Sequence, residues 1–279
     1  MGSKDKEQIY KTAPFKVWNK AKEIRNRIYQ EVIEAKDKGK LLIGGGAESL
    51  ITLASGFDHA FLTGEPYGAS VAHLYSEDPK LYMEIVEACE HKGFPRDLCA
   101  YMRNYIGSML VDKFIFGRGP FPKIDVCLQA GFCDTHYKWY QAVSEIRGVP
   151  FYSLDLVPLN WETSGESEEI KRLKHEFIYN QILEAIEWME KVTGRKYNDE
   201  KFIQGVYNEC ESTSLWAKCC VLNRNIPAPM DEKTMLSFYV LAVLGRYRDD
   251  VVEFYRELLA ELEEELQIRS LLFLMKRHV

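Results

Sequence analysis

Short apolar segments alternate with longer amphipathic ones along the first 160 or so residues, and this alternation strongly constrains the fold. Three apolar runs, at residues 40–43, 124–128 and 150–154, are typical of strands that are buried on both faces of a parallel sheet. The segments between them have apolar residues at helical spacing. We therefore expect an α/β sheet with crossover helices. The predicted helices cover residues 15–37, 47–56, 78–92, 97–110 and 134–147.

The pattern changes after residues 161–167, a polar stretch that suits a linker or turn. From there on only helical spacing is found, interrupted by breaks that contain glycine, asparagine or proline. We therefore divide the chain into an α/β domain at residues 1–162 and an all-helical segment at residues 163–279. The expected helices of this segment cover residues 167–192, 198–222 and two stretches within 231–275.

The charge balance excludes some classes of protein. The chain has 42 Asp and Glu residues against 36 Lys and Arg residues, a formal net charge of −6, which argues against a general nucleic-acid binder or a ligand of anionic membranes. Neither a signal peptide nor an apolar run of about 18 residues is present. We expect a cytoplasmic protein whose seven cysteines are reduced, catalytic or metal-bound rather than joined in disulfides.

Two of the cysteines occupy positions where a loop is expected to lead into a helix. Cys99 follows Asp97, a good N-cap residue, and lies close in sequence to Arg96 and Arg103. Cys133 follows a predicted strand and opens the next helix, which places it at the ligand-binding edge of the sheet. The positive end of a helix dipole favours a thiolate. Both residues are therefore candidate metal ligands, although packing as a small buried side chain is at least as good an interpretation of Cys99.

Other features give weaker indications. Gly44–Gly46, after a predicted strand, could cradle a phosphate at a helix N-terminus, but the P-loop and G-x-G-x-x-G patterns are missing and a tight turn is the alternative. Cys127 lies within a predicted strand and is expected to pack in the core. No two cysteines have the C-x-x-C spacing of a zinc ribbon or a ferredoxin.

Several short motifs are spread in order over nearly the whole chain. They are residues 47–51, residues 63–69, residues 92–101 with Gly107 behind them, Cys133 with residues 138–140, residues 188–197 and residues 227–230. Together these motifs resemble the 2-hydroxyacyl-CoA dehydratase and benzoyl-CoA reductase subunits, a family of oxygen-sensitive iron-sulfur enzymes from anaerobes. Each motif is short, but their shared order makes coincidence a poor explanation.

The resemblance implies a fold, a cofactor and partners. In this family two homologous subunits form a heterodimer, and each is built from two flavodoxin-like α/β domains with helical additions. Each subunit holds a 4Fe-4S cluster through three cysteines, of which Cys99 and Cys133 match the first two. A separate ATP-dependent iron-sulfur activator supplies one electron at very low potential, and the thioester of the acyl-CoA substrate is reduced to a ketyl radical. The resemblance leaves open whether a 2-hydroxyacyl-CoA is dehydrated or an aromatic ring is reduced.

The same resemblance assigns further site residues. Glu65 corresponds to an active-site glutamate, and a carboxylate there could move a substrate proton. The alternative for Glu65 is an exposed acid beside a Gly-Pro turn. Gly45, Gly46 and Ser49 are candidate substrate contacts. His136 is either a hydrogen-bond donor at the substrate site or a solvated helix residue.

The chain departs from the family pattern in its length of 279 residues, because members of the family are longer. The second α/β domain is expected to be absent, together with the third cysteine ligand of the cluster. Neither Cys210 nor Cys219 lies in a matching context. Loss of one thiolate should weaken or abolish cluster binding unless another chain or an exogenous thiol replaces it. A truncated or frame-shifted product, or one half of a split subunit, would account for this length.

Two other classes of protein remain open. A non-catalytic α/β binding or assembly module would bind no iron. A cysteine-nucleophile acyl transferase would use Cys99 or Cys133 with His136 as its base, but the sequence indicates neither an orienting acid nor an oxyanion-binding element.

Overall fold

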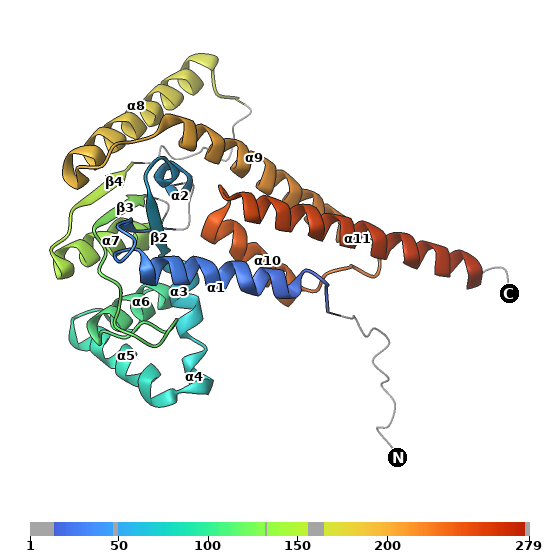
Figure 1. The fold of residues 1–279 in the computed structure, drawn as a ribbon, viewed down its shortest axis with the longest axis horizontal. Coiled ribbons are helices and arrows are strands. Elements are labelled where there is room, and N and C mark those ends of the chain that lie inside the picture. Colours follow the sequence, from blue (N-terminus) through green and yellow to red (C-terminus); the bar gives the residue numbers. More distant parts are fainter. Residues whose placement is uncertain (1–13, 47–49, 132, 156–164, 277–279) are drawn as a thin grey trace.

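The computed structural model describes residues 14–46, 50–131, 133–155 and 165–276, with only the backbone described for residues 268–276. Its centre is a sheet of four parallel strands in the order β2-β1-β3-β4 (Figure 1). This is the order in which a flavodoxin-like sheet begins, so the expected α/β fold is confirmed. The strands are β1 (Leu41–Gly45), β2 (His59–Thr63), β3 (Val126–Ala130) and β4 (Phe151–Leu154).

Helices cover both faces of this sheet, because successive side chains of a strand point to opposite faces and both sets are apolar. Leu42 and Leu62 belong to a core shared with α1, α3, α5, α6 and α7, whereas Ile43 and Leu128 belong to a second core on the other face, shared with α2. The helices of this part are α1 (Trp18–Glu34), α2 (Leu50–Leu53), α3 (Gly64–Val71), α4 (Leu74–Glu77), α5 (Pro79–His91), α6 (Ala100–Leu110) and α7 (Asp134–Arg147).

Four longer helices follow, close to the predicted bounds: α8 (Glu168–Thr193), α9 (Asp199–Leu222), α10 (Glu232–Gly245) and α11 (Asp249–Lys276). Local chemistry sets their ends. The side chains of Ser167, Asn198 and Asp231 accept hydrogen bonds from main-chain amides in the first turns of α8, α9 and α10. Gly194 ends α8 in the left-handed conformation, with φ of 67°, which glycine adopts without strain.

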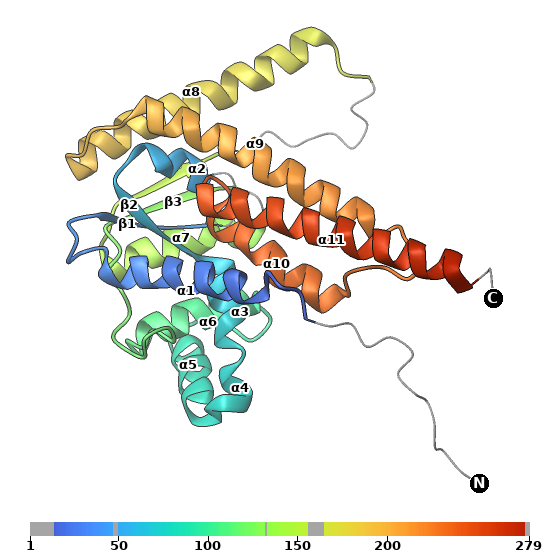
Figure 2. The ribbon, with the colours of Figure 1, turned by 45° about the vertical axis from the view of Figure 1, so that its right-hand side comes forward.

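The long helices pack on both sides of the α/β part. α8 lies over β4 on one face, and α10 packs beside α1 on the other, while α9 and α11 run side by side (Figures 1 and 2). A partly buried ion-pair network joins the helical part to α1. The guanidinium of Arg248 binds the carboxylate of Glu31 at 2.8 and 3.1 Å and that of Asp250 at 3.0 and 3.1 Å. The division of the chain near residue 162 falls outside the described residues and stays a prediction.

Some predicted bounds were wrong. β2 and α3, which sequence periodicity did not indicate, together make up residues 59–71. Gly44 and Gly45 are residues of β1 rather than a turn, because they pair with Leu62 and Thr63 of β2. α6 begins at Ala100 instead of at residue 97, since Cys99 has ψ of 124° and is not helical.

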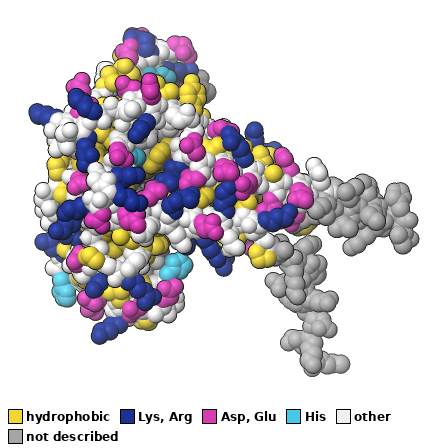
Figure 3. Space-filling model, viewed as in Figure 1, with side chains coloured by type: hydrophobic (Ala, Val, Ile, Leu, Met, Phe, Trp, Pro, Cys, Tyr) yellow, Lys and Arg dark blue, Asp and Glu magenta, His cyan; other side chains and the backbone are white. Residues whose placement is uncertain are grey.

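The surface carries interspersed charges of both signs, and Figure 3 shows acidic and basic side chains mixed over the face that includes α1 and α11. Lys20 of α1, for example, contacts Glu257 of α11 at 2.8 Å. Among the helices of the described residues, none has the length and apolar character needed to cross a membrane.

Candidate active site

The carboxyl ends of β1, β2 and β3 meet at one edge of the sheet. In the strand register, Gly45 of β1 pairs with Thr63 of β2 on one side and with Leu128 of β3 on the other. The segments that follow these strands therefore start close together. In doubly wound sheets the ligand crevice lies at this edge, where the strand order reverses between β1 and β3.

Glu65 and His136 meet at this edge, although 71 residues separate them in the sequence. Glu65 lies in the first turn of α3 and His136 in the first turn of α7, and the imidazole Nε2 contacts the carboxylate Oε1. The side chains are only 19% and 8% exposed, respectively. An acid in the first turn of a helix is also favoured by the helix dipole. Glu65 is thus partly buried and paired, and neither Glu65 nor His136 is a solvated surface residue.

Several buried polar atoms around this pair have no hydrogen-bond partner among the described residues. They are the second carboxylate oxygen of Glu65, the hydroxyl of Thr63 and the indole Nε1 of Trp139. Buried polar groups of native proteins are almost always hydrogen-bonded, and each unpaired group costs about 1–3 kcal/mol. One acceptor and two donors next to the contact between Glu65 and His136 could therefore bind polar groups of a substrate.

Gly64 lets α3 and α7 approach closely at the site. A Cβ at this position would lie 2.2 Å from the hydroxyl oxygen of Tyr140 and 2.8 Å from Cζ2 of Trp139. The rings of Trp139 and Tyr140 are stacked with 5.5 Å between their centroids, and both are fully buried. The residue before Glu65 therefore packs directly on two buried aromatic rings of the helix that carries His136.

The three candidate substrate contacts after β1 have different outcomes. Gly45 is the buried last residue of β1, and a Cβ there would be 2.5 Å from both the carbonyl oxygen of Leu128 and Cζ of Phe61. Gly46 follows it and is also buried. Ser49 lies outside the described residues. Gly45 therefore contributes close strand packing, and a substrate contact by any of the three stays a prediction.

Cys99 is the N-cap residue of α6 and is partly buried against the main core. Its helix docks tightly on α3, because a Cβ on Gly68 would lie 2.3 Å from the carbonyl oxygen of Tyr101. Arg96 and Arg103 both bind Glu90, with nitrogen–oxygen distances of 2.9 and 2.8 Å. The positive charge expected near Cys99 is therefore partly compensated by a carboxylate.

Cys133 is the exposed N-cap residue of α7, three positions before His136. Residues at this spacing share a helix face, so the thiol and the imidazole belong to the same end of α7. As expected, Cys133 follows β3 at the carboxyl edge. Neither Cys133 nor Cys99 uses its side chain to cap its helix.

Three other cysteines have structural positions. Burial raises the pKa of Cys89 to about 11 and the pKa values of Cys127 and Cys219 to about 12. Thiols of this kind are poor ligands and nucleophiles, so the core-packing role expected for Cys127 is confirmed. In the part of the chain that the structure describes, no group of three or more His, Cys, Asp and Glu side chains could hold a metal ion.

Thr63, Trp139 and Tyr140 are site residues that sequence reasoning did not single out for function. The sequence could have placed Thr63 at the end of a strand, because residues 59–63 are a short apolar run followed by glycine. Trp139 and Tyr140 contributed only to the family resemblance. Their place beneath the contact between Glu65 and His136 depends on how α7 packs against β1 and α3, which no local pattern indicates.

The fold and the site define a class of protein: a doubly wound α/β protein with an acid, an imidazole and a thiol at the strand carboxyl ends. Residues 79–272 match the family model described as 2-hydroxyglutaryl-CoA dehydratase, D-component, and the chain belongs to this family.

Curated relatives agree with this membership. The chain is 26% identical over 242 residues to the (R)-2-hydroxyisocaproyl-CoA dehydratase alpha subunit of Clostridioides difficile, covering 86% of this chain and 56% of the relative. It is 24% identical over 251 residues to the lactoyl-CoA dehydratase subunit alpha of Anaerotignum propionicum, covering 85% and 57%. The (R)-phenyllactyl-CoA dehydratase alpha subunit of Clostridium sporogenes is 25% identical over 182 residues, covering 64% and 43%. The chain thus spans about half the length of these relatives.

Proposed function

We propose that this chain acts as part of an alpha-type subunit of a 2-hydroxyacyl-CoA dehydratase, with its active site at the carboxyl edge of the sheet. The observation that carries the proposal is the partly buried contact between Glu65 and His136. His136 lies in the first turn of α7, the helix that begins after Cys133. The relatives support dehydration over reduction of an aromatic ring, because those compared above are named as dehydratase subunits.

Cys99 and Cys133 are the residues that would hold a 4Fe-4S cluster. Both are at helix N-termini, where a thiolate is favoured, and thiolates are the usual ligands of iron-sulfur clusters. A third ligand has to come from outside the described residues, since no group of three potential ligands is assembled within them. When bound, such a cluster supplies low-potential electron transfer to the thioester.

Dehydration removes the hydroxyl group from C2 of the acyl chain and a proton from C3, and it leaves an enoyl thioester and water. The leaving hydroxyl needs a proton and the C3 proton needs an acceptor, two tasks that a carboxyl and an imidazole can perform. Glu65 and His136 are in contact, so a proton taken up by one can pass to the other. Thr63 and Trp139 have unpaired donors that would orient the substrate's oxygen atoms.

The proposal includes three partners. A homologous second subunit would complete the enzyme, an ATP-dependent iron-sulfur activator would deliver the electron, and an acyl-CoA would be the substrate. The alpha-subunit names of the relatives support the first of these.

Anaerobic dehydration assays test the proposal through the rate at which enoyl-CoA forms in the assembled, activated enzyme. Glu65→Gln keeps the shape of the side chain but removes its acid–base function, and it should lower the rate about 100-fold or more. Glu87→Gln, an exposed acid on α5, serves as the matched control and should leave the rate unchanged. Equal rates for the wild type and Glu65→Gln would refute the assignment of Glu65.

A second candidate, a non-catalytic assembly module, has one observation in its favour: the described residues bring together no complete set of three metal ligands. Such a module would bind neither iron nor acyl-CoA. Binding of acyl-CoA by the chain would exclude it.

A further inference from the structure

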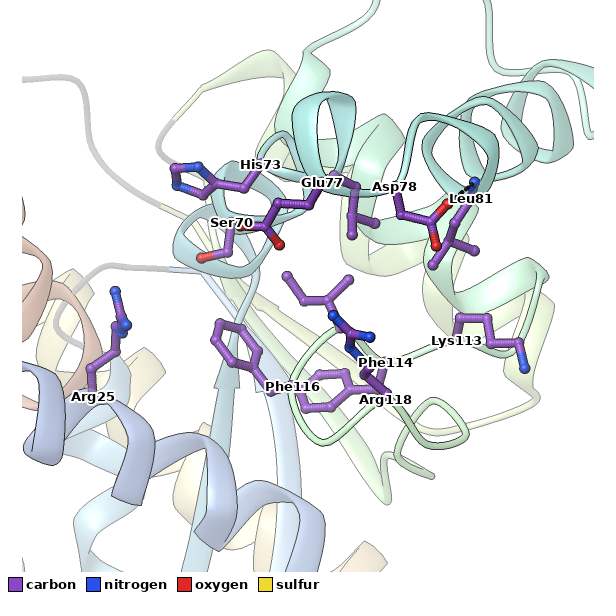
Figure 4. Close-up of a pocket in the computed structure, with 12 residues that line it drawn as sticks. Arg25, Ser70, His73, Glu77, Asp78, Leu81, Lys113, Phe114, Phe116 and Arg118 are labelled. Carbon is purple, nitrogen blue, oxygen red and sulfur yellow. Dashed lines mark hydrogen bonds between the residues drawn. The ribbon is translucent and has the colours of Figure 1, made fainter.

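A cavity lies at the C-terminal end of α3, the opposite end from Glu65. It is lined by residues of α1, α3, α4, the first turn of α5 and the loop of residues 113–118, and it has a volume of about 400 Å³ (Figure 4). Cavities of about 300–1,000 Å³ are typical of small-molecule sites. No residue of the proposed active site lines this cavity.

Three cationic side chains line the cavity: Arg25, Lys113 and Arg118. In Figure 4 they are spread across it, with Arg25 and Lys113 on opposite sides. Among the described residues none of the three has a carboxylate partner within 4.0 Å. Two acids also line the cavity, but Asp78 is engaged at the N-cap of α5, where it accepts a hydrogen bond of 3.1 Å.

Arg25 shows the clearest need for a ligand. Its Nε atom is shielded from solvent and has no hydrogen-bond partner within the described part of the chain. A shielded guanidinium nitrogen without a partner is costly. Arg25 also borders an adjacent cavity of about 270 Å³ between α1, α3 and α10, so its side chain lies where two cavities meet. An anion bound there would accept a hydrogen bond from the Nε atom of Arg25.

The rest of the lining fits a nucleotide better than a simple anion. Leu74, Leu81 and Phe116 are partly buried apolar side chains that line the same cavity. Separated cations suit several phosphate groups, and an apolar wall suits a nucleobase. Arginine binds phosphate oxygens in a bidentate fashion, which adds geometric specificity.

We propose that this cavity binds the phosphate-bearing nucleotide end of a CoA thioester. The inference rests on the proposed function, which supplies the CoA thioester as substrate. α3 carries Glu65 in its first turn and Ser70 in its last, and at 1.5 Å per residue this helix is roughly 12 Å long. The adjacent cavity borders Pro66, Ala69 and Ser70 of the same helix, so a ligand with its phosphates beside Arg25 would run along α3 towards Glu65.

Calorimetric titration of the full chain with CoA and with ADP tests this proposal. Arg25→Gln and Arg118→Gln should each weaken CoA binding about tenfold, equivalent to about 1.4 kcal/mol. Glu77→Gln removes a negative charge from the cavity and should tighten binding about twofold. Arg224→Gln is the matched control, since this exposed arginine lies outside both cavities, and it should bind like the wild type.

The outcomes separate this proposal from the proposed function. ADP should compete with CoA and lose affinity in Arg25→Gln, since it shares the nucleotide end. CoA binding that is unchanged in both arginine variants would overturn the cavity assignment, while a Glu65-dependent dehydration activity would still stand. Binding of ADP but not of CoA would overturn the assignment to a thioester substrate. CoA binding that depends on Arg25, without any dehydration by the assembled enzyme, would support the assignment of the cavity to CoA and refute the proposed reaction.

Discussion

The hydroxyl of Tyr140 in α7 donates a hydrogen bond of 2.5 Å to the carbonyl oxygen of Gly45, the last residue of β1. This bond ties the helix that carries His136 to the strand beside β2, and β2 leads directly into Glu65. The ring of Tyr140 is fully buried and packs beneath Gly64. The position of His136 relative to Glu65 is therefore set by buried contacts between regular elements rather than by surface loops.

Replacing Tyr140 with phenylalanine removes this hydrogen bond and leaves the buried carbonyl of Gly45 without it. We expect the free energy of unfolding to fall by about 1–2 kcal/mol, as measured by urea denaturation. Tyr137→Phe is the control, because the hydroxyl of Tyr137 binds Asp155 at 3.1 Å in an exposed position. Its loss should be below about 0.5 kcal/mol. Equal losses in the two variants would show that the buried hydrogen bond from Tyr140 to Gly45 stabilises the fold no more than the exposed one from Tyr137.

A methyl group at Gly64 would collide with Tyr140 and Trp139. Because overpacking of a buried contact typically costs about 1–3 kcal/mol, Gly64→Ala should lower the free energy of unfolding by that amount. Gly119→Ala is the matched control, since a Cβ there meets no atom within 4 Å. Thermal unfolding of both variants checks the prediction, and it fails if Gly119→Ala is the more destabilising change.

The sequence predicted regular elements well where they are long, and poorly where they are short. Helical periodicity over 26 residues identified α8, whereas β2 has five residues and its apolar run is too short to distinguish from a buried helix segment. The start of α6 was missed because Asp97, a good N-cap by type, is not used as the cap. The backbone at Cys99 is extended instead.

The candidate site was only partly predictable for a different reason. Both cysteines at helix starts could be identified locally. Cys133 follows a strand that leads through a turn into a helix, and Cys99 follows a proline and an aspartate that precede a predicted helix. The contact between Glu65 and His136 depends on the strand order, which brings the ends of β2 and β3 to opposite sides of β1. That order follows from packing of the whole sheet, so local patterns do not contain it.

His59, at the start of β2, should make stability depend on pH. Burial lowers its pKa to about 4, and its ring lies between the carbonyl of Phe57 at 3.0 Å and the hydroxyl of Tyr247 at 3.2 Å. In the unfolded chain the pKa of histidine is about 6.5, so below that pH the unfolded state binds the proton better. The free energy of unfolding is therefore unaffected by His59 above pH 6.5, where the imidazole is neutral in both states. It decreases as the pH falls from 6.5 towards 4, where only the unfolded state binds the proton.

Between pH 7 and pH 5 the loss attributable to His59 should be about 2 kcal/mol. Urea denaturation of the wild type and of His59→Gln at several pH values measures it as the difference between the two pH profiles. Parallel profiles would contradict the buried neutral imidazole.

The ion-pair network of Arg248 should hold the helical part against α1. Its side chain is 18% exposed and its guanidinium is shared by Glu31 and Asp250. Arg248→Gln leaves the partly buried carboxylate of Glu31 without its partner and leaves Asp250 with Arg27 alone. We expect a loss of about 3 kcal/mol in the free energy of unfolding. Arg256→Gln breaks an exposed pair with Glu211 and should cost less than about 1 kcal/mol. Similar losses of unfolding free energy in both variants would show that the Arg248 network stabilises the fold no more than an exposed ion pair does.

Iron and acid-labile sulfide analysis of anaerobically reconstituted protein tests the role of Cys99 and Cys133, the two cysteines at helix N-termini. The wild type, Cys99→Ser, Cys133→Ser and Cys210→Ser are compared, with Cys210 as an exposed cysteine outside the site. We predict that the wild type and Cys210→Ser bind iron, and that each of the other two substitutions reduces or abolishes binding. Iron that is bound by the wild type and is retained in full by Cys99→Ser and Cys133→Ser would contradict the assignment of Cys99 and Cys133 as ligands.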